Sequence, residues 1–283
     1  SIPDKLRKER AYSDYFKISN YAKPVDGNYL LKIVEQASEH SYTDFIELRA
    51  LDHRQGATAG ITRDGKPFLY DTLMPVGSMN DLDGKGYTPG TGIALYNDEG
   101  MEIQLPPEAF SSGILAVNWQ GFLDGQGEGH TAAQGRPKLS LERKNPQGIW
   151  QTVDWVYPRD EMQQTFFLMD NRSAGWDKDG KVRLVASSCE NDKYHRIESV
   201  QWGNAITDNI SASSLPLVSA QSGSEDVLDK VRSSDGESLH LGPGEEVSLT
   251  FKSSPLDEGL ERTLIFVSEG YYVPVPMVHF AGN

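Results

Sequence analysis

Alternation of apolar and polar residues is the clearest pattern in the chain. It begins with two extended strands, joined by a polar connection, between residues 27 and 53. Their apolar positions are Tyr29, Leu31 and Ile33 in the first strand and Ile46, Leu48 and Ala50 in the second. Glu47 and Arg49 point the other way, and a period of two is typical of a strand that buries one face. The two strands therefore need further strands to cover their apolar faces.

Short strands and tight turns follow to the end of the chain. Residues 114–119 are a continuous apolar run, typical of a buried strand, and residues 246–252 alternate cleanly again. Turn signals such as Arg63-Asp64-Gly65-Lys66 separate the runs, and helical periodicity is limited to the N-terminal segment and residues 225–232. The pattern predicts an all-β fold of one or two packed antiparallel β-sandwiches, with long loops rich in Gly, Ser and Asp.

Changes in composition along the chain indicate four parts. Residues 1–22 are an N-terminal lead-in whose aromatic residues are expected to pack on the first sheet. Residues 23–113 form a β subdomain, and residues 114–206 form a β-sandwich subdomain. Residues 207–283 hold a loop-rich segment and the closing strands. If those strands pair back with the first sheet, the halves of the chain are inseparable.

Composition and charge support a folded protein and disfavour some partners. Of the 283 residues, 37% are hydrophobic and 10% aromatic, which is enough for a sizeable core. The net charge of −14 repels polyphosphate and anionic membrane surfaces, so nucleic-acid binding and membrane docking are disfavoured. No apolar run has the length of a membrane span. The carboxylates instead suit a soluble, exposed protein that binds cations such as Ca²⁺.

One cysteine and six histidines limit the chemistry further. Because Cys189 is the single cysteine of the sequence, an intrachain disulfide, a thiolate metal cluster and a Cys-x-x-Cys-His haem motif are excluded. The histidines show neither His-x-His nor His-x-x-x-His spacing, so the sequence contains no local metal pair. His53, at a strand end, and His195 are each either a lone ligand or base, or a hydrogen-bonded structural residue.

Two Asp-x-Asp-Gly turns are the best candidates for a metal site. Asp81 and Asp83 belong to the first turn, and Asp177 and Asp179 belong to the second. Two carboxylates on a tight turn can share a hard cation, which makes both turns candidate Ca²⁺ sites. Neither turn has the earlier acidic residue or the closing glutamate of an EF-hand. Asp-Gly is also a common turn sequence in β proteins, so a purely structural role stays open.

Carbohydrate binding and glycoside hydrolysis are further possibilities. Trp176, beside the second Asp-Gly turn, is the best candidate for a platform that stacks on a sugar ring. The other large aromatics that either stack on sugars or fill the core are Trp119, Phe122, Trp150, Trp155 and Trp202. Nucleophile-elbow, Ser-x-x-Lys and P-loop motifs are absent, so no catalytic residue is assigned. A glycosidase needs only two carboxylates that converge in the fold, and 41 acidic residues single out no pair.

Three stretches together resemble a known class of proteins. They are Lys23–Tyr29 leading into Tyr42–His53, Val182–Val185 through His195–Val200, and Arg262–Tyr272. In sequence and order they are similar to the β-rich C-terminal part of large secreted or cell-surface prokaryotic proteins that carry FG-GAP-like β-propellers or helical repeats. The resemblance implies an extracytoplasmic, non-catalytic β module and brings no catalytic residue with it. This chain differs in being short and in lacking a propeller or repeat region.

We therefore expect a non-catalytic, extracytoplasmic module without a cofactor, acting as a structural or interaction subunit of an exported or cell-surface assembly. Its partners would be other protein subunits or domains of that assembly. The alternatives are a carbohydrate-binding module with structural Ca²⁺, whose partner is a glycan, and a glycosidase-like enzyme. A haem-binding subunit is more distant, because nothing singles out a histidine or methionine as an axial ligand.

Overall fold

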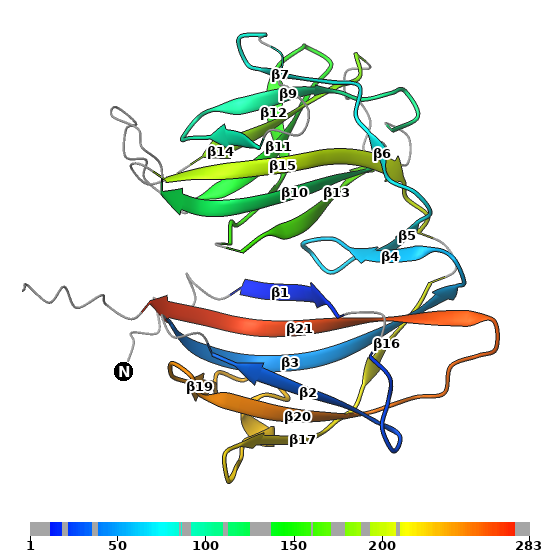
Figure 1. The fold of residues 1–283 in the computed structure, drawn as a ribbon, viewed down its shortest axis with the longest axis vertical. Helices are drawn as coiled ribbons and strands as arrows, with labels where there is room; N and C mark the ends of the chain where they lie inside the picture. Colours follow the sequence, from blue (N-terminus) through cyan, green and yellow to red (C-terminus); the bar gives the residue numbers. More distant parts are fainter. Residues whose placement is uncertain are drawn as a thin grey trace, which may run out of the picture. The chain divides into compact units, whose positions relative to one another are not determined.

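The chain divides into two compact units, and the second unit is inserted into the first (Figure 1). The computed structural model describes residues 12–18, 22–35, 39–84, 86, 92–109, 113–124, 137–159, 161–170, 179–187, 193–207 and 210–274. Unit 1 comprises residues 1–55 and 209–283, and unit 2 comprises residues 56–208. The strand pairs within both units are antiparallel, which confirms the predicted all-β fold of packed antiparallel sheets.

Unit 1 is a sandwich of two sheets. The β3 sheet has the strand order β1–β21–β3–β16, with β19 also paired to β3, and the β20 sheet has the order β18–β17–β20–β2. The elements of unit 1 are β1 (Tyr12–Lys17), β2 (Asn28–Val34), β3 (Glu39–Arg54), β16 (Ser211–Leu215), β17 (Leu217–Ser222), β18 (Glu225–Asp226), the 3₁₀ helix η1 (Leu228–Lys230), β19 (Leu239–Leu241), β20 (Glu246–Lys252) and β21 (Leu260–Pro274). A core of buried side chains from both sheets lies between them.

The two opening strands belong to different sheets of unit 1. β2 pairs with β20, whereas β3 pairs with β21 and β16. Their predicted faces are nevertheless correct, because Ile46, Leu48 and Ala50 are buried in the core, together with Tyr29. The apolar face of each opening strand is therefore covered by the sheet that contains the other.

The closing strand β21 pairs with β3 from Leu260, opposite Arg54, to Pro274, opposite Glu39. The expected return of the closing strands to the first sheet is thus confirmed. The register shifts once, between Glu269 and Gly270, and a Cβ atom at Gly270 would lie 2.2 Å from the backbone oxygen of Tyr42. Only glycine fits this close approach of two backbones without a shift of the strands.

Several loop expectations for unit 1 need correction. The lead-in contains a strand, β1, which pairs with β21. The expected packing of its aromatic residues on the first sheet is confirmed for Phe16, whose ring centroid lies 6.3 Å from that of Phe266. The segment expected to be rich in loops, residues 203–240, contains β16, β17, β18 and the start of β19. Its polar residues lie on solvent-facing strand positions, so they lower hydrophobicity without preventing strand formation.

Unit 2 is a second sandwich. Its strands are β4 (Thr58–Ile61), β5 (Pro67–Tyr70), β6 (Met74–Pro75), β7 (Ser78–Asp81), β8 (Ile93–Leu95), β9 (Gly100–Gln104), β10 (Gly113–Asp124), β11 (Lys138–Lys144), β12 (Trp150–Val156), β13 (Gln163–Asp170), β14 (Lys181–Ser187) and β15 (Lys193–Asn204). One sheet has the order β13–β10–β15–β6, with β8 on β15, and the other has the order β12–β11–β14–β9–β7. Strands β4 and β5 form a separate hairpin.

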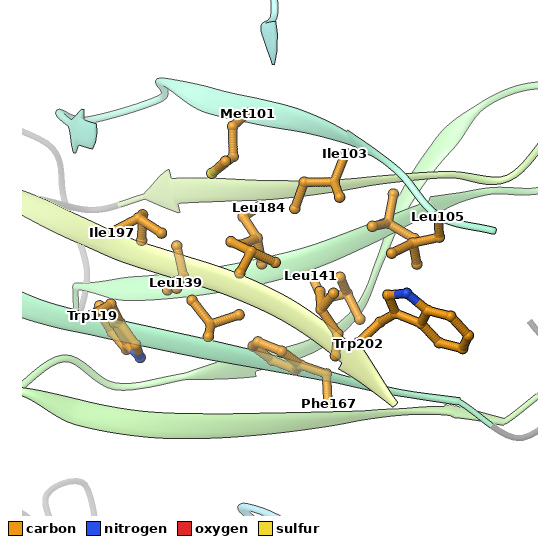
Figure 2. Close-up of a cluster of buried hydrophobic side chains, with 14 of the residues drawn as sticks. Met101, Ile103, Leu105, Trp119, Leu139, Leu141, Phe167, Leu184, Ile197 and Trp202 are labelled. Carbon is orange, nitrogen blue, oxygen red and sulfur yellow. The ribbon is translucent and has the colours of Figure 1, made fainter. Parts of the chain in front are cut away.

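The core of unit 2 lies between its two sheets (Figure 2). Trp119 of β10 is fully buried, and its indole Nε1–H donates to Thr165 Oγ1 at 2.9 Å, which satisfies the polar edge of a large apolar ring. Phe167 of β13 packs in the same cluster as Leu139 and Leu184 of the facing sheet. The predicted buried strand at residues 114–119 is confirmed, because β10 has buried side chains on both faces. Leu115, Val117 and Trp119 belong to the core between the sheets, and Ile114 and Ala116 belong to a second buried cluster.

The structure divides the chain at other positions than those expected from composition. A boundary near residue 113 would separate β9 from β14 and would lie at the start of β10, yet all three strands belong to unit 2. The chain instead leaves unit 1 after β3 and returns at β16, where Ser211 lies opposite Asp52. The insertion therefore begins and ends at neighbouring strand ends, which composition does not reveal.

Replacement of residues 56–208 by a short Gly/Ser linker is expected to leave unit 1 folded. The linker needs to span only neighbouring strands, whose axes are about 4.8 Å apart. Far-UV circular dichroism and urea unfolding would show a β spectrum and a single cooperative transition. Non-cooperative unfolding of this shortened chain would contradict the division into two units.

Candidate interaction site

The Asp81 turn uses its carboxylate to order its own backbone. Asp81 ends β7, and its Oδ1 accepts the backbone N–H of Asp83 at 3.0 Å, while its carbonyl oxygen accepts the N–H of Gly84 at 3.0 Å. This is an Asx turn closed by a glycine with φ of +90°. Across the described part of the chain, no three His, Cys, Asp or Glu side chains group as metal ligands. Calcium binding at Asp81 and Asp83 stays a prediction.

Asp179 has protein partners on both carboxylate oxygens. Its Oδ2 lies 2.6 Å from Lys144 Nζ, and its Oδ1 accepts the backbone N–H of Lys181 at 2.9 Å. Burial opposes ionisation of Asp179, but these hydrogen bonds and the two lysine charges outweigh it, so its pKa lies below the ordinary value. The other predicted residues of this turn, Trp176 and Asp177, lie outside the described residues, as does Cys189.

The described tryptophans are engaged within unit 2. Trp119 and Trp202 are buried in the core. Trp150 and Trp155 are half-buried, and each has an arginine over its ring: Arg183 at 4.0 Å and Arg63 at 4.3 Å from the ring centroids. A sugar that stacks on the ring face covered by the arginine would have to displace a cation–π contact. Of the tryptophans that the structure describes, two are buried and two carry an arginine over the ring.

The two histidines singled out in the sequence are structural. His53 is buried, with Nδ1 3.0 Å from the backbone oxygen of Arg54 and Nε2 2.9 Å from Thr263 Oγ1. His195 is buried against Trp119, with ring centroids 5.3 Å apart. Burial lowers the pKa of His195 to about 4, and backbone hydrogen bonds to Tyr194 and Lys138 only partly oppose this shift. Neither residue lies in an open site where it could act as a base on a substrate.

A cavity of about 340 Å³ lies between the two sheets of unit 1. Apolar side chains from both sheets line it, including Ile46, Phe266 and Val247. Its polar lining residues are Lys32, Glu35, Ser41, Thr43, Ser268 and Tyr272. Glu35 is the one carboxylate among the described lining residues, so the cavity lacks the carboxylate pair of a glycosidase.

The cavity is bordered by the edge strands of both sheets. Phe16 of β1 and residues 32–34 of β2 line it. β1 is one terminal strand of the β3 sheet, and β2 is one terminal strand of the β20 sheet. Apolar side chains on the outer face of β2 are also exposed: Leu30 by 63% and Val34 by 54%. The cavity and β2 together form the candidate interaction site. Sequence alternation located β2, but it could not show that β2 is an edge strand.

The structure also brings together two histidines that sequence spacing keeps apart. His40 is on β3 and His240 is on β19, and His40 Nδ1 lies 3.0 Å from His240 Nε2. The pair exists because β19 pairs with the start of β3, with His240 opposite Tyr42. No local sequence motif predicts a contact between residues that are 200 positions apart. Covariation among homologous sequences is the kind of signal that could have found it.

Comparisons with known proteins leave the family open. No family model and no curated protein matches the chain. Solved structures of the VP2 protein of infectious bursal disease virus are similar over most of it. VP2 from T=1 particles is 10% identical to this chain, the match covers 94% of this chain and 78% of VP2, and the TM-score is 0.17. VP2 from a subviral particle is also 10% identical, the match covers 94% of this chain and 81% of VP2, and the TM-score is 0.18. Scores this low carry no argument about function.

His195 predicts a specific pH dependence for unit 2. Its pKa is about 4 in the folded protein and about 6.5 in an unfolded chain, so the unfolded state binds the proton more tightly. The contribution of His195 to the free energy of unfolding is therefore complete above about pH 6.5 and is lost as the pH falls towards 4. We expect a loss of about 3 kcal/mol in the free energy of unfolding from this residue.

Urea unfolding at pH 7, 5.5 and 4, followed by tryptophan fluorescence, would measure this loss. The His195→Gln variant is expected to lose the steep part of the pH dependence, because the glutamine side chain does not titrate. Parallel pH profiles for the two proteins would show that His195 does not bind the proton preferentially in the unfolded state.

Proposed function

We propose that the protein is a non-catalytic interaction module that binds another protein chain along the β2 edge of unit 1. The observation that carries this proposal is an apolar edge strand next to a cavity between two sheets. An unpaired edge presents a row of backbone N–H and C=O groups, which is a template for a strand from another chain.

The two edge strands that border the cavity, β1 and β2, differ in how they are protected. β1 carries the polar residues Ser13, Asp14 and Lys17, a composition that discourages pairing with other chains. β2 has the sequence Asn-Tyr-Leu-Leu-Lys-Ile-Val, without proline and with one charge. That charge, on Lys32, is paired with Glu246 of the neighbouring strand at 2.8 Å. β2 therefore has less protection against edge pairing than β1.

The hydrogen-bond pattern of β2 fits strand addition. Directly after β2, the N–H of Glu35 donates to the carbonyl oxygen of Glu245, the residue before β20, at 2.8 Å. Alternation along an antiparallel pair then directs the backbone groups of Leu30, Lys32 and Val34 away from β20. In the described residues, the isolated bridge between Val25 and Asn28 is the contact on this side of β2. Three outward residues are thus available to an added strand.

The cavity supplies specificity in this proposal. Ile33 faces the cavity, so a strand added beside β2 would direct alternate side chains towards the same space. Apolar walls and hydroxyl groups suit a medium-sized apolar side chain with a polar neighbour. Backbone pairing would then provide affinity, and the cavity would select the partner's sequence.

An extracytoplasmic location and a role in an exported or cell-surface assembly are part of the same proposal. They rest on the resemblance of Lys23–Tyr29, Tyr42–His53 and Arg262–Tyr272 to secreted prokaryotic proteins, and they agree with the net charge of −14. Among the residues described, no helix combines the length and apolar character required to cross a membrane. The tryptophans that the structure describes do not add support for the alternative, a carbohydrate-binding module.

The β2 edge can be tested with paired charge substitutions. In the Leu30→Asp/Val34→Asp variant, two carboxylates on the outer face of β2 should prevent an apolar partner from docking, while the buried residues of β2 are unchanged. Native mass spectrometry of protein isolated from its source should show wild type in a complex of defined mass, and the variant should be free of the partner. Hydrogen exchange should show protection of residues 28–34 in the complex.

Ile149→Asp is the matched control, because Ile149 is an apolar residue of unit 2 that is 60% exposed. It is expected to keep the partner. If wild type is free, if the double variant retains the partner, or if the control loses it equally, then β2 is not the interaction site. Circular dichroism of both variants must match wild type.

A further inference from the structure

The two ring nitrogens of the histidine pair in unit 1 are about as far apart as two ligands of one metal ion. His40 Nδ1 and His240 Nε2 lie 3.0 Å apart, and the ring centroids are 5.1 Å apart with an interplanar angle of 22°. Two nitrogens on one ion at about 2.0–2.1 Å are separated by about 2.9 Å in a square arrangement and about 3.3 Å in a tetrahedral one. The observed separation falls between these values. It is also the length of a hydrogen bond in which one ring donates to the other, so an ion bound by both nitrogens takes the place of the shared proton.

The pair is accessible to ions in solution. Ser41 and Thr43 line the cavity, so their strand neighbours His40 and Tyr42 point to the opposite face of β3. His240 is exposed and His40 is half-buried. The pair therefore lies on the face of β3 that is opposite the cavity.

Neighbouring groups hold both rings in place. The His240 ring stacks on Tyr42 with centroids 4.6 Å apart, and Tyr42 stacks on Tyr271 with centroids 4.8 Å apart. His40 lies beside Gly242, where a Cβ atom would be 3.5 Å from His40 Nδ1. Rings that are already oriented lose less conformational freedom when they bind an ion.

A carboxylate lies close to the pair. Glu245 Oε2 accepts the backbone N–H of Gly242 at 2.6 Å and would lie 3.4 Å from the same Cβ position. Its negative charge favours a cation at the histidines. The described residues do not provide a group of three ligands, so an ion there would keep water in its remaining positions.

We propose that His40 and His240 form a two-histidine site for a divalent transition-metal ion, with Cu²⁺ bound more tightly than Zn²⁺. Imidazole nitrogen suits both ions, and Cu²⁺ generally binds a given nitrogen site more tightly. Each neutral ring presents a lone pair to the ion when its proton is on the other nitrogen. The bound ion would join β19 to β3 directly, and its open positions could take a ligand from a partner.

Metal titration of the full-length protein tests the site. Protein freed of metal with EDTA and exchanged into buffer is titrated with Cu²⁺ and with Zn²⁺ by calorimetry. We expect one tight site in wild type, with Cu²⁺ the tighter ion, and affinity weaker by at least about tenfold in His40→Gln and in His240→Gln. The Cu²⁺ electron paramagnetic resonance spectrum should show two coupled nitrogens in wild type.

His130→Gln is the matched control, because it also removes one histidine but not from the pair. It should bind Cu²⁺ like wild type, and Zn²⁺ should raise the unfolding temperature of wild type and of this control but not of the His40→Gln/His240→Gln protein. Equal Cu²⁺ affinity in wild type and the double variant would overturn the proposal, as would a spectrum with fewer than two nitrogens. Circular dichroism of the double variant separates loss of the site from loss of the fold.

Discussion

The antiparallel pairing of β3 with β21 is the interaction on which the β3 sheet of unit 1 depends. Strands β1, β16 and β19 each attach to one of these two strands. Near one end of the pair, Arg262 lies opposite Asp52, with Nε 2.6 Å from Oδ1 and Nη2 2.7 Å from Oδ2. This bidentate bond raises the pKa of Arg262, although burial acts in the opposite direction. Shifting the register by one residue would break the bond and turn the apolar face of β3 outward.

The position of unit 2 makes this pairing easier to form. β3 and β21 are separated in the chain by all of unit 2, and closing a long disordered loop costs conformational entropy. Within unit 2, backbone hydrogen bonds of 2.8 Å join Leu69, in the second strand of its first hairpin, to Ile206, near its C-terminal end. Once unit 2 is folded, it acts as a short connection between β3 and β16. An inserted unit that folds by itself therefore allows strands far apart in the chain, such as β3 and β21, to pair in one sheet.

Sequence reasoning succeeded where a local pattern determines the structure. Alternation predicted the buried faces of β3 and β20, since each side chain's direction follows from the period of the strand. It could not assign β2 and β3 to different sheets, because the partners β20 and β21 come from the far end of the chain. The His40–His240 contact has the same origin. The motif at Asp81 fits two roles, and of these the structure shows the turn that its carboxylate orders.

Strand alternation also links the two proposed sites of unit 1. Ser41 and Thr43 face the cavity, and His40 and Tyr42 face the other side of the same strand segment. β19 repeats the arrangement, because Leu239 and Leu241 line the cavity while His240 stacks on Tyr42. A movement of β19 therefore changes the cavity wall and the separation of the two imidazoles together. If an ion holds β19 against β3, it favours one shape of the cavity, and a partner that requires that shape must in turn strengthen metal binding, because coupling between two sites is reciprocal.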